Sequence, residues 1–187
     1  NTPARRKFMR SPGTEFGQIN DLVVRLAMVN PDVAFRLTHN DRKVRDLPPD
    51  QSRKERCIDL LGKDLAGGLL EFGHTDAPDR GSAIAWGLAG MPSLARATSK
   101  FQHVCVNGRP IKDRRLQHAI KEAYRGLLAP DRHPVAVLFL DISPDLIDVN
   151  VHPTKSEIRF RDSSRLHGMV LTAIRQRLLG SDLTPTA

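Results

Sequence analysis

The sequence has few of the features that mark secreted and membrane proteins. Only two of its 187 residues are cysteine, Cys57 and Cys105, and they do not form a CxxC pair. Two separated cysteines argue against a disulfide framework and against a zinc ribbon. No apolar run approaches the roughly 20 residues that a membrane-spanning helix needs, and the first ten residues contain no apolar signal-peptide core. We therefore expect a cytoplasmic protein with no membrane partner.

Common catalytic and nucleotide-binding motifs are also missing. The chain has no HExxH, GxGxxG, Walker or GxSxG segment. Its seven histidines are scattered and show no recognised metal-ligand spacing, so no metal site is predicted. Gly67 and Gly68 lie within a predicted strand and are a poor candidate for a phosphate-binding loop. The sequence thus offers little support for an independent small-molecule enzyme.

Positive charge is abundant and concentrated. Residues 1–10 contain four Lys or Arg and no acid, and residues 109–125 contain six Lys or Arg against two acids. These two segments carry the whole formal net charge of +8. Because only 5% of the residues are aromatic, this charge suggests a polyanion held by its backbone more than by base stacking. For any single basic run, a solvated surface is the commoner explanation.

Apolar periodicity and turn residues predict an α+β fold. Helical spacing of apolar residues indicates helices over 12–29, 52–61, 113–128 and 164–178, the last capped by Ser163. Strands are predicted over 33–37, 43–47, 66–75, 82–89, 100–106, 135–142, 146–151 and 156–160, with tight turns at Asn40-Asp41 and Asn107-Gly108. Runs of strands with intervening helices favour a mixed β-sheet with helices packed on it, as one domain or as two lobes divided near residues 91–99.

The turn and helix start at residues 107–115 form the first candidate site. Arg114 and Arg115 occupy the first turn of a predicted helix, where the helix dipole disfavours cations by up to about 1 kcal/mol. Cations beside free helix N–H groups form an anion site when a phosphate arrives. We therefore predict a contact to a nucleic-acid backbone through Arg109, Lys112, Arg114 and Arg115. The alternative is an ordinary tight turn leading into an exposed helix.

The segment around His152-Pro153 is the second candidate site. Pro153 restricts His152 to extended geometry, so the loop that follows holds Lys155 at a defined place. A lysine on a stiff loop can act as a point charge for a phosphate. From these residues alone, a hairpin with a solvated lysine is the simpler explanation.

Three sequence blocks together resemble the MutL family of DNA mismatch repair proteins. They are NTPARRKF at residues 1–8, VNGR at 106–109 and DVNVHPTKSEIRF at 148–160. Their order and separation also match the family, and the resemblance extends over essentially the whole chain. It implies that residues 11–180 form the family's transducer domain, which has a ribosomal-protein-like α+β fold. Residues 1–10 would then be a remnant of the preceding GHKL ATPase domain, and residues 181–187 a tail toward a missing linker.

The resemblance also implies specific roles. In the family, the lysine that Lys155 matches reaches the γ-phosphate of ATP in the neighbouring GHKL domain, and Arg114 matches a DNA-contacting arginine. Arg109, Lys112 and Arg115 are included because they lie near Arg114. ATP and Mg²⁺ would be cofactors of the full-length protein, with none bound to this fragment. The family's Glu-x-x-x-Asn helix and Asp-x-Gly-x-Gly loop are absent from these residues, so no ATP hydrolysis is expected from the fragment alone.

The implied function is coupling of ATP binding and hydrolysis to domain closure, dimerisation and DNA binding. The implied partners are the adjacent ATPase domain, double- or single-stranded DNA with weak sequence preference, a second copy of the protein and a mismatch-recognition protein, in a bacterial-type cytoplasm with nucleoid DNA. The main alternative is a stand-alone basic RNA-binding module of related fold. That reading explains the charge but gives no role to Lys155 or to the first eight residues.

Overall fold

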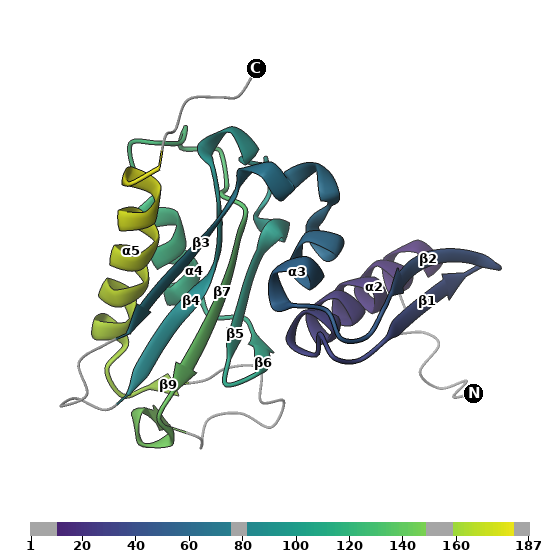
Figure 1. Cartoon of the computed structure of the whole chain (residues 1–187), viewed down its shortest axis with the longest axis horizontal. Helices are drawn as coiled ribbons and strands as arrows, with labels where there is room; N and C mark the ends of the chain where they lie inside the picture. The colour runs from purple at the N-terminus through teal and green to yellow at the C-terminus, as the bar shows by residue number, and fades with distance from the viewer. Residues whose placement is uncertain (1–10, 76–81, 149–158, 182–187) are drawn as a thin grey trace. The chain divides into compact units, whose positions relative to one another are not determined.

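A computed structural model describes residues 11–75, 82–148 and 159–181 of the chain (Figure 1). The chain divides into two compact units, Asn1–Leu60 and Leu61–Ala187, called below the N-terminal and the C-terminal unit. The division therefore lies ahead of the main sheet and not near residues 91–99. The predicted domain limits at residues 10/11 and 180/181 fall at the edges of the described ranges and stay predictions.

In its described residues, 11–60, the N-terminal unit contains two helices and one β-hairpin: α2 (Pro12–Val29), β1 (Phe35–His39), β2 (Arg42–Leu47) and α3 (Arg53–Leu61). Helix α2 begins at the Ser11 cap with proline at its first position, as predicted. Asn40 and Asp41 have φ values of 48° and 58°, which places the hairpin turn at the predicted dipeptide. The strands pair antiparallel, with Phe35 opposite Leu47.

A buried arginine holds the loops of the N-terminal unit together. Arg56 on α3 is completely buried, and its Nη2 donates to the carbonyl oxygens of Pro31 and Val33, both at 2.9 Å, and to that of Pro48. Helix α3 starts in a capping box in which Ser52 and Glu55 bond to each other's backbone N–H groups. Burial lowers the pKa of Arg56, although arginine remains charged at neutral pH.

The C-terminal unit is built on a five-stranded mixed sheet. The strand order is β3 (Leu69–Thr75), β4 (Ala83–Gly90), β7 (Ala136–Ile142), β5 (Gln102–Val106) and β6 (Arg109–Ile111). Strands β5 and β7 are parallel and the other neighbours are antiparallel. A parallel pair requires a crossover, and helix α4 (Arg114–Ala123) lies within the connection between β5 and β7. The described part of this unit also contains short 3₁₀ helices: η1 (Lys63–Gly68), η3 (Pro92–Leu94), η4 (Ser99–Phe101) and η5 (Pro144–Leu146).

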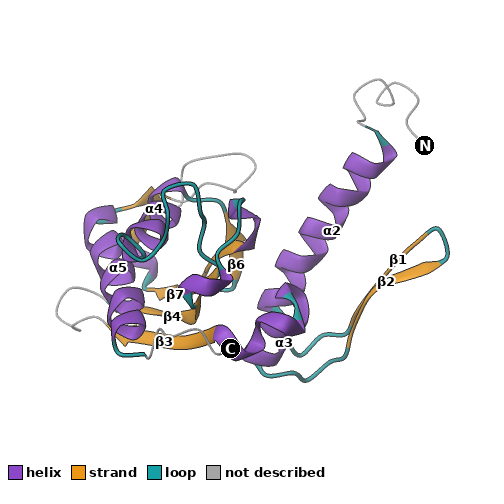
Figure 2. Ribbon diagram, turned by 90° about the horizontal axis from the view of Figure 1, so that it is seen from above, coloured by secondary structure: helices purple, strands orange, loops and turns teal. Residues whose placement is uncertain are grey.

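Helices α4 and α5 (Ser163–Leu179) cover one face of this sheet (Figure 2). The core between them contains fully buried side chains from β7 and from both helices, among them Leu138, Leu140, Ile120, Ile174 and Leu178. The apolar run of β7, with five consecutive buried residues, is typical of a central strand. The layer arrangement confirms the predicted α+β class with helices packed on a mixed sheet.

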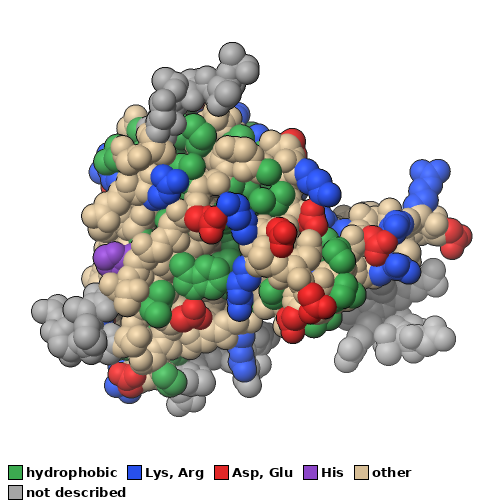
Figure 3. Space-filling model, in the orientation of Figure 1, with side chains coloured by type: hydrophobic (Ala, Val, Ile, Leu, Met, Phe, Trp, Pro, Cys, Tyr) green, Lys and Arg blue, Asp and Glu red, His purple; other side chains and the backbone are tan. Residues whose placement is uncertain are grey.

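The opposite face of the sheet carries a smaller aromatic contact. Trp86 stacks on Phe139 with ring centroids 4.4 Å apart, and its Nε1 donates to Asp141 Oδ2 at 2.8 Å. In Figure 3 hydrophobic side chains are visible on this face among charged ones. In the core on the helix-covered face, the Tyr124 hydroxyl donates to the Gly90 carbonyl at 2.7 Å. Burial raises the pKa of this tyrosine.

Two positions in the sheet depend on special backbone geometry. Gly87 has a φ of 153°, and a Cβ there would lie 1.9 Å from the carbonyl oxygen of Val137. Asn107 has a φ of 47° in the turn between β5 and β6. Its side chain donates to the Ile142 carbonyl at 2.9 Å and accepts from the Ile142 N–H at 2.8 Å. Asn107 thereby anchors the turn to the end of the central strand.

Several predicted boundaries were wrong, each for a local reason. Helix α4 ends at Ala123 and not near residue 128: the N–H of its cap Tyr124 bonds back to the Lys121 carbonyl, and the chain then turns through Gly126, whose φ is 80°. Asp162, not Ser163, caps α5, since its side chain accepts from the Arg165 N–H. The strand predicted over 66–75 begins at Leu69, because the preceding residues form η1.

Candidate nucleic-acid interface

The predicted cations lie at the start of helix α4. Arg109 is exposed on β6 and Lys112 is exposed just after it, while Arg114 and Arg115 are the first two residues of α4 and are both exposed. Asp113 caps the helix, because its Oδ1 accepts from the Leu116 N–H at 2.9 Å. The first turn of α4 contains no acidic residue. The two arginines therefore stand beside the positive end of the helix dipole.

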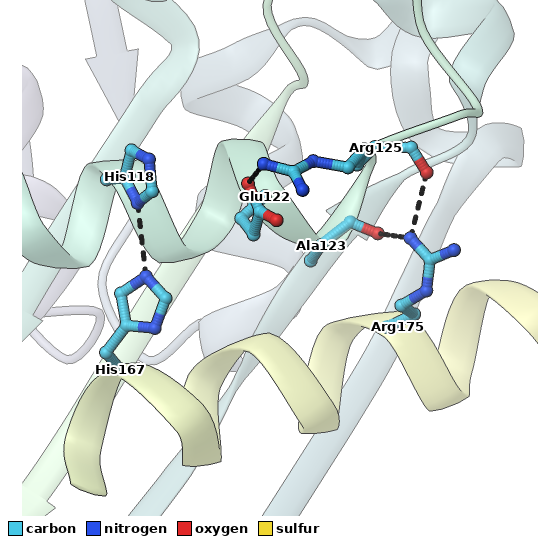
Figure 4. Close-up of polar contacts among 6 residues, drawn as sticks. All are labelled: His118, Glu122, Ala123, Arg125, His167 and Arg175. Carbon is cyan, nitrogen blue, oxygen red and sulfur yellow. Dashed lines mark hydrogen bonds and ion pairs between the residues drawn. The ribbon is translucent and has the colours of Figure 1, made fainter. Parts of the chain in front are cut away.

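The start of α5 lies beside the start of α4. Three contacts define the alignment: Arg115 Nη1 donates to Ser163 Oγ, His118 meets His167, and Arg175 Nη1 donates to the carbonyls of Ala123 and Arg125. From the first of these contacts to the last, the residue numbers increase on both helices. Helices α4 and α5 therefore run parallel (Figure 4). Both helices lack acidic residues in the first turn. Each helix is capped by one aspartate, Asp113 or Asp162, and the two N-termini point the same way with basic residues around them.

A hollow of about 860 Å³ opens at these helix ends. Its lining includes Lys112, Asp113, Arg114, Arg115, Gln117, Arg159, Phe160 and Ser163. The structure thus brings together three of the four predicted cations, and Arg109 is not among the lining residues. Within the described ranges, no carboxylate forms an ion pair with Lys112, Arg114 or Arg159. Four positive side chains around one open hollow attract a polyanion.

Arg159 is a site residue that the sequence analysis did not select. It lies on β9 (Arg159–Phe160), which pairs antiparallel with β8 (Ile147–Asp148), and it precedes the cap of α5 by three residues. No periodicity or motif relates residue 159 to residues 112–115. Only the side-by-side packing of α4 and α5 brings these segments together.

A second hollow of about 450 Å³ adjoins the first. It shares Arg114, Arg115 and Ser163 with the larger hollow and adds His118, Ser164 and His167. The histidines are scattered along the sequence, but these two, 49 residues apart, are in contact in the structure. The spacing of His118 from Arg114, four residues along one helix, was a signal that could have included it.

Lys155 lies outside the described residues, and its role stays a prediction. The antiparallel pairing of β8 with β9, with Ile147 opposite Phe160, brings together the two ends of the segment that contains it. The two strands predicted around this segment are thus present as a pair of two residues each in the described part.

Two negative findings apply to the residues the structure describes. Within residues 11–75, 82–148 and 159–181, no group of three or more His, Cys, Asp or Glu side chains is placed to hold a metal ion. Among these same residues, no helix combines the length and apolarity needed to cross a membrane.

Sequence comparisons connect the chain to proteins of DNA repair. A family model described as the C-terminal domain of DNA mismatch repair proteins matches residues 57–179, a range that begins close to the division between the two units. The DNA mismatch repair protein MutL of Paramagnetospirillum magneticum is 43% identical over 185 residues, which are 96% of this chain and 30% of that protein. MutL of Sphingopyxis alaskensis is 44% identical over 176 residues, 94% of this chain and 28% of that protein. The chain thus spans about 30% of the length of these relatives.

Solved structures share the fold. The N-terminal domain of a DNA repair protein superposes with a TM-score of 0.80 at 20% identity and covers 96% of this chain and 58% of that one. The Aquifex aeolicus MutL ATPase domain complexed with ADP superposes with a TM-score of 0.56 at 22% identity, covering 91% and 53%. Because the family model matches about two thirds of the chain and the relatives are 43–44% identical to it, the chain belongs to the MutL family of DNA mismatch repair proteins.

Proposed function

We propose that this chain is the part of a MutL protein that holds the DNA backbone and couples that contact to the nucleotide state of an adjacent GHKL ATPase domain. The observation that carries the DNA contact is the hollow at the paired N-termini of α4 and α5, with its four cations. Guanidinium and ammonium groups at a helix N-terminus bind phosphate oxygens regardless of base sequence. Arg109, exposed on β6, extends this positive surface.

The coupling part of the proposal concerns Lys155. A lysine supplied from one domain to the γ-phosphate of ATP in its neighbour acts like an arginine finger. It stabilises the arrangement in which the two domains are closed, and this stabilisation disappears when the γ-phosphate leaves. ATP and Mg²⁺ in the adjacent domain supply the phosphoryl chemistry. Domain closure then favours dimerisation of the full-length protein around DNA, in response to a mismatch-recognition partner.

Binding measurements on the full-length protein test the DNA contact. We expect Arg114→Glu to weaken binding to two duplexes of unrelated sequence by the same factor, because a phosphate contact carries no sequence information. The matched control is Arg125→Glu, at the opposite end of α4, where the arginine pairs with Glu122 at 2.7 Å. Loss of binding to only one duplex, or equal loss in the control, would contradict the proposal. Preference for structured RNA over both duplexes would favour the RNA-binding alternative.

Steady-state ATP hydrolysis tests the coupling. Lys155→Ala in the full-length protein is expected to slow turnover by at least about tenfold, in keeping with the large effect of charges placed at a transferring phosphate. Lys100→Ala, at an exposed lysine of η4, is the control and should leave turnover unchanged. Normal turnover in the Lys155 variant would rule out the γ-phosphate contact while leaving the DNA contact untouched.

A further inference from the structure

Two histidines meet across the helix pair, one turn beyond the arginines of the DNA surface. His118 Nδ1 on α4 lies 3.2 Å from His167 Nε2 on α5, and the ring centroids are 5.4 Å apart (Figure 4). Both rings line the smaller hollow together with Arg114 and Arg115. Two imidazoles in hydrogen-bond contact therefore lie in the same hollow as two arginines.

The number of protons on this histidine pair determines whether its outer nitrogens are hydrogen-bond donors or acceptors toward the hollow. A neutral imidazole has one N–H and one bare nitrogen. When both rings are neutral, one N–H serves the bond between them, so one outer nitrogen carries a proton and the other is a bare acceptor. A single added proton leaves the shared bond intact and converts both outer nitrogens into donors. The singly protonated pair is therefore a cation with two outward N–H groups, which suits a phosphate.

The surroundings link protonation to the presence of an anion. Arg114 and Arg115 face the pair from α4, and the hydroxyl groups of Ser163 and Ser164 face it from α5. A phosphate bound in the hollow would place negative charge beside the pair and favour its protonated form. One turn further along α4 stands Glu122, whose carboxylate accepts a hydrogen bond from Arg125 at 2.7 Å (Figure 4).

Lys121, another cation near the pair on α4, has a hydrogen-bond partner outside the hollow. Lys121 donates to the Pro130 carbonyl at 3.2 Å. Of the described residues that line the smaller hollow, none is an Asp or a Glu. Since the nearby carboxylate of Glu122 is paired with Arg125, a bound anion is the remaining source of negative charge that would stabilise a protonated pair.

We infer that His118 and His167 form a phosphate-binding subsite of the DNA surface that takes up one proton when a backbone phosphate binds. This inference rests on the proposed function and adds to it a second contact point and a pH dependence. Imidazole is the side chain whose charge changes most readily between pH 5 and 8. DNA affinity should therefore rise as the pH falls through this range, by at most about tenfold per pH unit for one proton.

Fluorescence anisotropy with a labelled mixed-sequence duplex tests the inference on the full-length protein. Affinity is measured from pH 5.5 to 8.5 at constant ionic strength, both with and without a metal chelator. His118→Gln and His167→Gln keep a polar side chain but cannot take up the proton. His74→Gln, on β3, is the matched control. Thermal unfolding of each variant, followed by circular dichroism, identifies any variant that does not fold.

The expected result is a difference in pH profile. Wild type and the His74 variant should bind about three- to tenfold more tightly at pH 6 than at pH 7.5, whereas both subsite variants should show a flatter profile and match wild type within about twofold at pH 8.5. The same steep profile in either folded subsite variant overturns the inference, as does a flat profile in wild type. An effect that vanishes with the chelator also overturns it, because a metal would then be the ligand.

The proposed function is tested separately at high pH. At pH 8.5 the histidine pair is expected to contribute little, so Arg114→Glu reports on the arginine surface alone. Weaker binding of that variant at pH 8.5, with unchanged pH profiles in the histidine variants, supports the DNA surface and refutes the subsite. Unchanged binding by the Arg114 variant at every pH refutes the DNA surface itself.

Discussion

The most direct quantitative prediction concerns the salt dependence of DNA binding. The larger hollow gathers the cations of Lys112, Arg114, Arg115 and Arg159. If each neutralises one phosphate, log K should fall against log salt with a slope of roughly −3.6, since each duplex phosphate contributes about −0.9. Between about 50 and 200 mM salt, affinity should then fall roughly 150-fold.

The change in this slope on replacing a single cation shows whether that cation contacts a phosphate. Replacing any one of the four cations with glutamine should reduce the slope to roughly −2.7, so that the same change in salt weakens binding only about 40-fold. Arg125→Gln, outside the hollow, should leave the slope unchanged. The assay is fluorescence anisotropy of a labelled duplex at four or more salt concentrations. An affinity insensitive to salt, or a slope unaltered by all four substitutions, would refute the reasoning.

Three further predictions concern stability and reactivity. Gly87→Ala should destabilise the C-terminal unit by at least about 3 kcal/mol in chemical denaturation, because its Cβ would lie 1.9 Å from the Val137 oxygen. Asn107→Ala should cost about 2 kcal/mol in the same assay, since it loses both side-chain bonds to Ile142 and keeps a positive φ. Burial raises the pKa of the Cys57 thiol to about 12. Iodoacetamide should therefore label this thiol slowly in native protein at pH 8.5 and quickly in denatured protein. Because only the unfolded state loses the proton above about pH 8.5, the contribution of Cys57 to stability should fall as the pH rises above that value.

Much of the local structure was predictable because its causes lie within a few residues. The cap at Ser11, the turn at Asn40-Asp41 and the apolar run of β7 each depend on neighbours in sequence. Predictions failed where two local signals competed. The apolar stripe continues to residue 128, yet α4 ends at Ala123 and the chain turns through Gly126, which has a positive φ. Asp162 and Ser163 can both cap a helix, and the carboxylate took that role.

The candidate site was only partly predictable. Charge counting and the helix start singled out Lys112, Arg114 and Arg115, because a cation in a first helical turn is locally unfavourable without an anion. Arg159 and His167 carried no comparable signal, since their relation to α4 depends on a neighbour more than 40 residues away. Lys155 was singled out by the family's motif and stays a prediction.

Composition and short-range pattern predicted the α+β class and the basic helix start, because charge and periodicity are properties of the linear chain. Three sequence blocks resembled the MutL family, and the identity to its members showed that the chain belongs to it. The parallel packing of α4 against α5 was decided only by folding. Burial of the apolar faces of both helices on one sheet aligned their positive ends and created the two hollows. Which cations and histidines share a hollow follows from that alignment, and no interval along the chain encodes it.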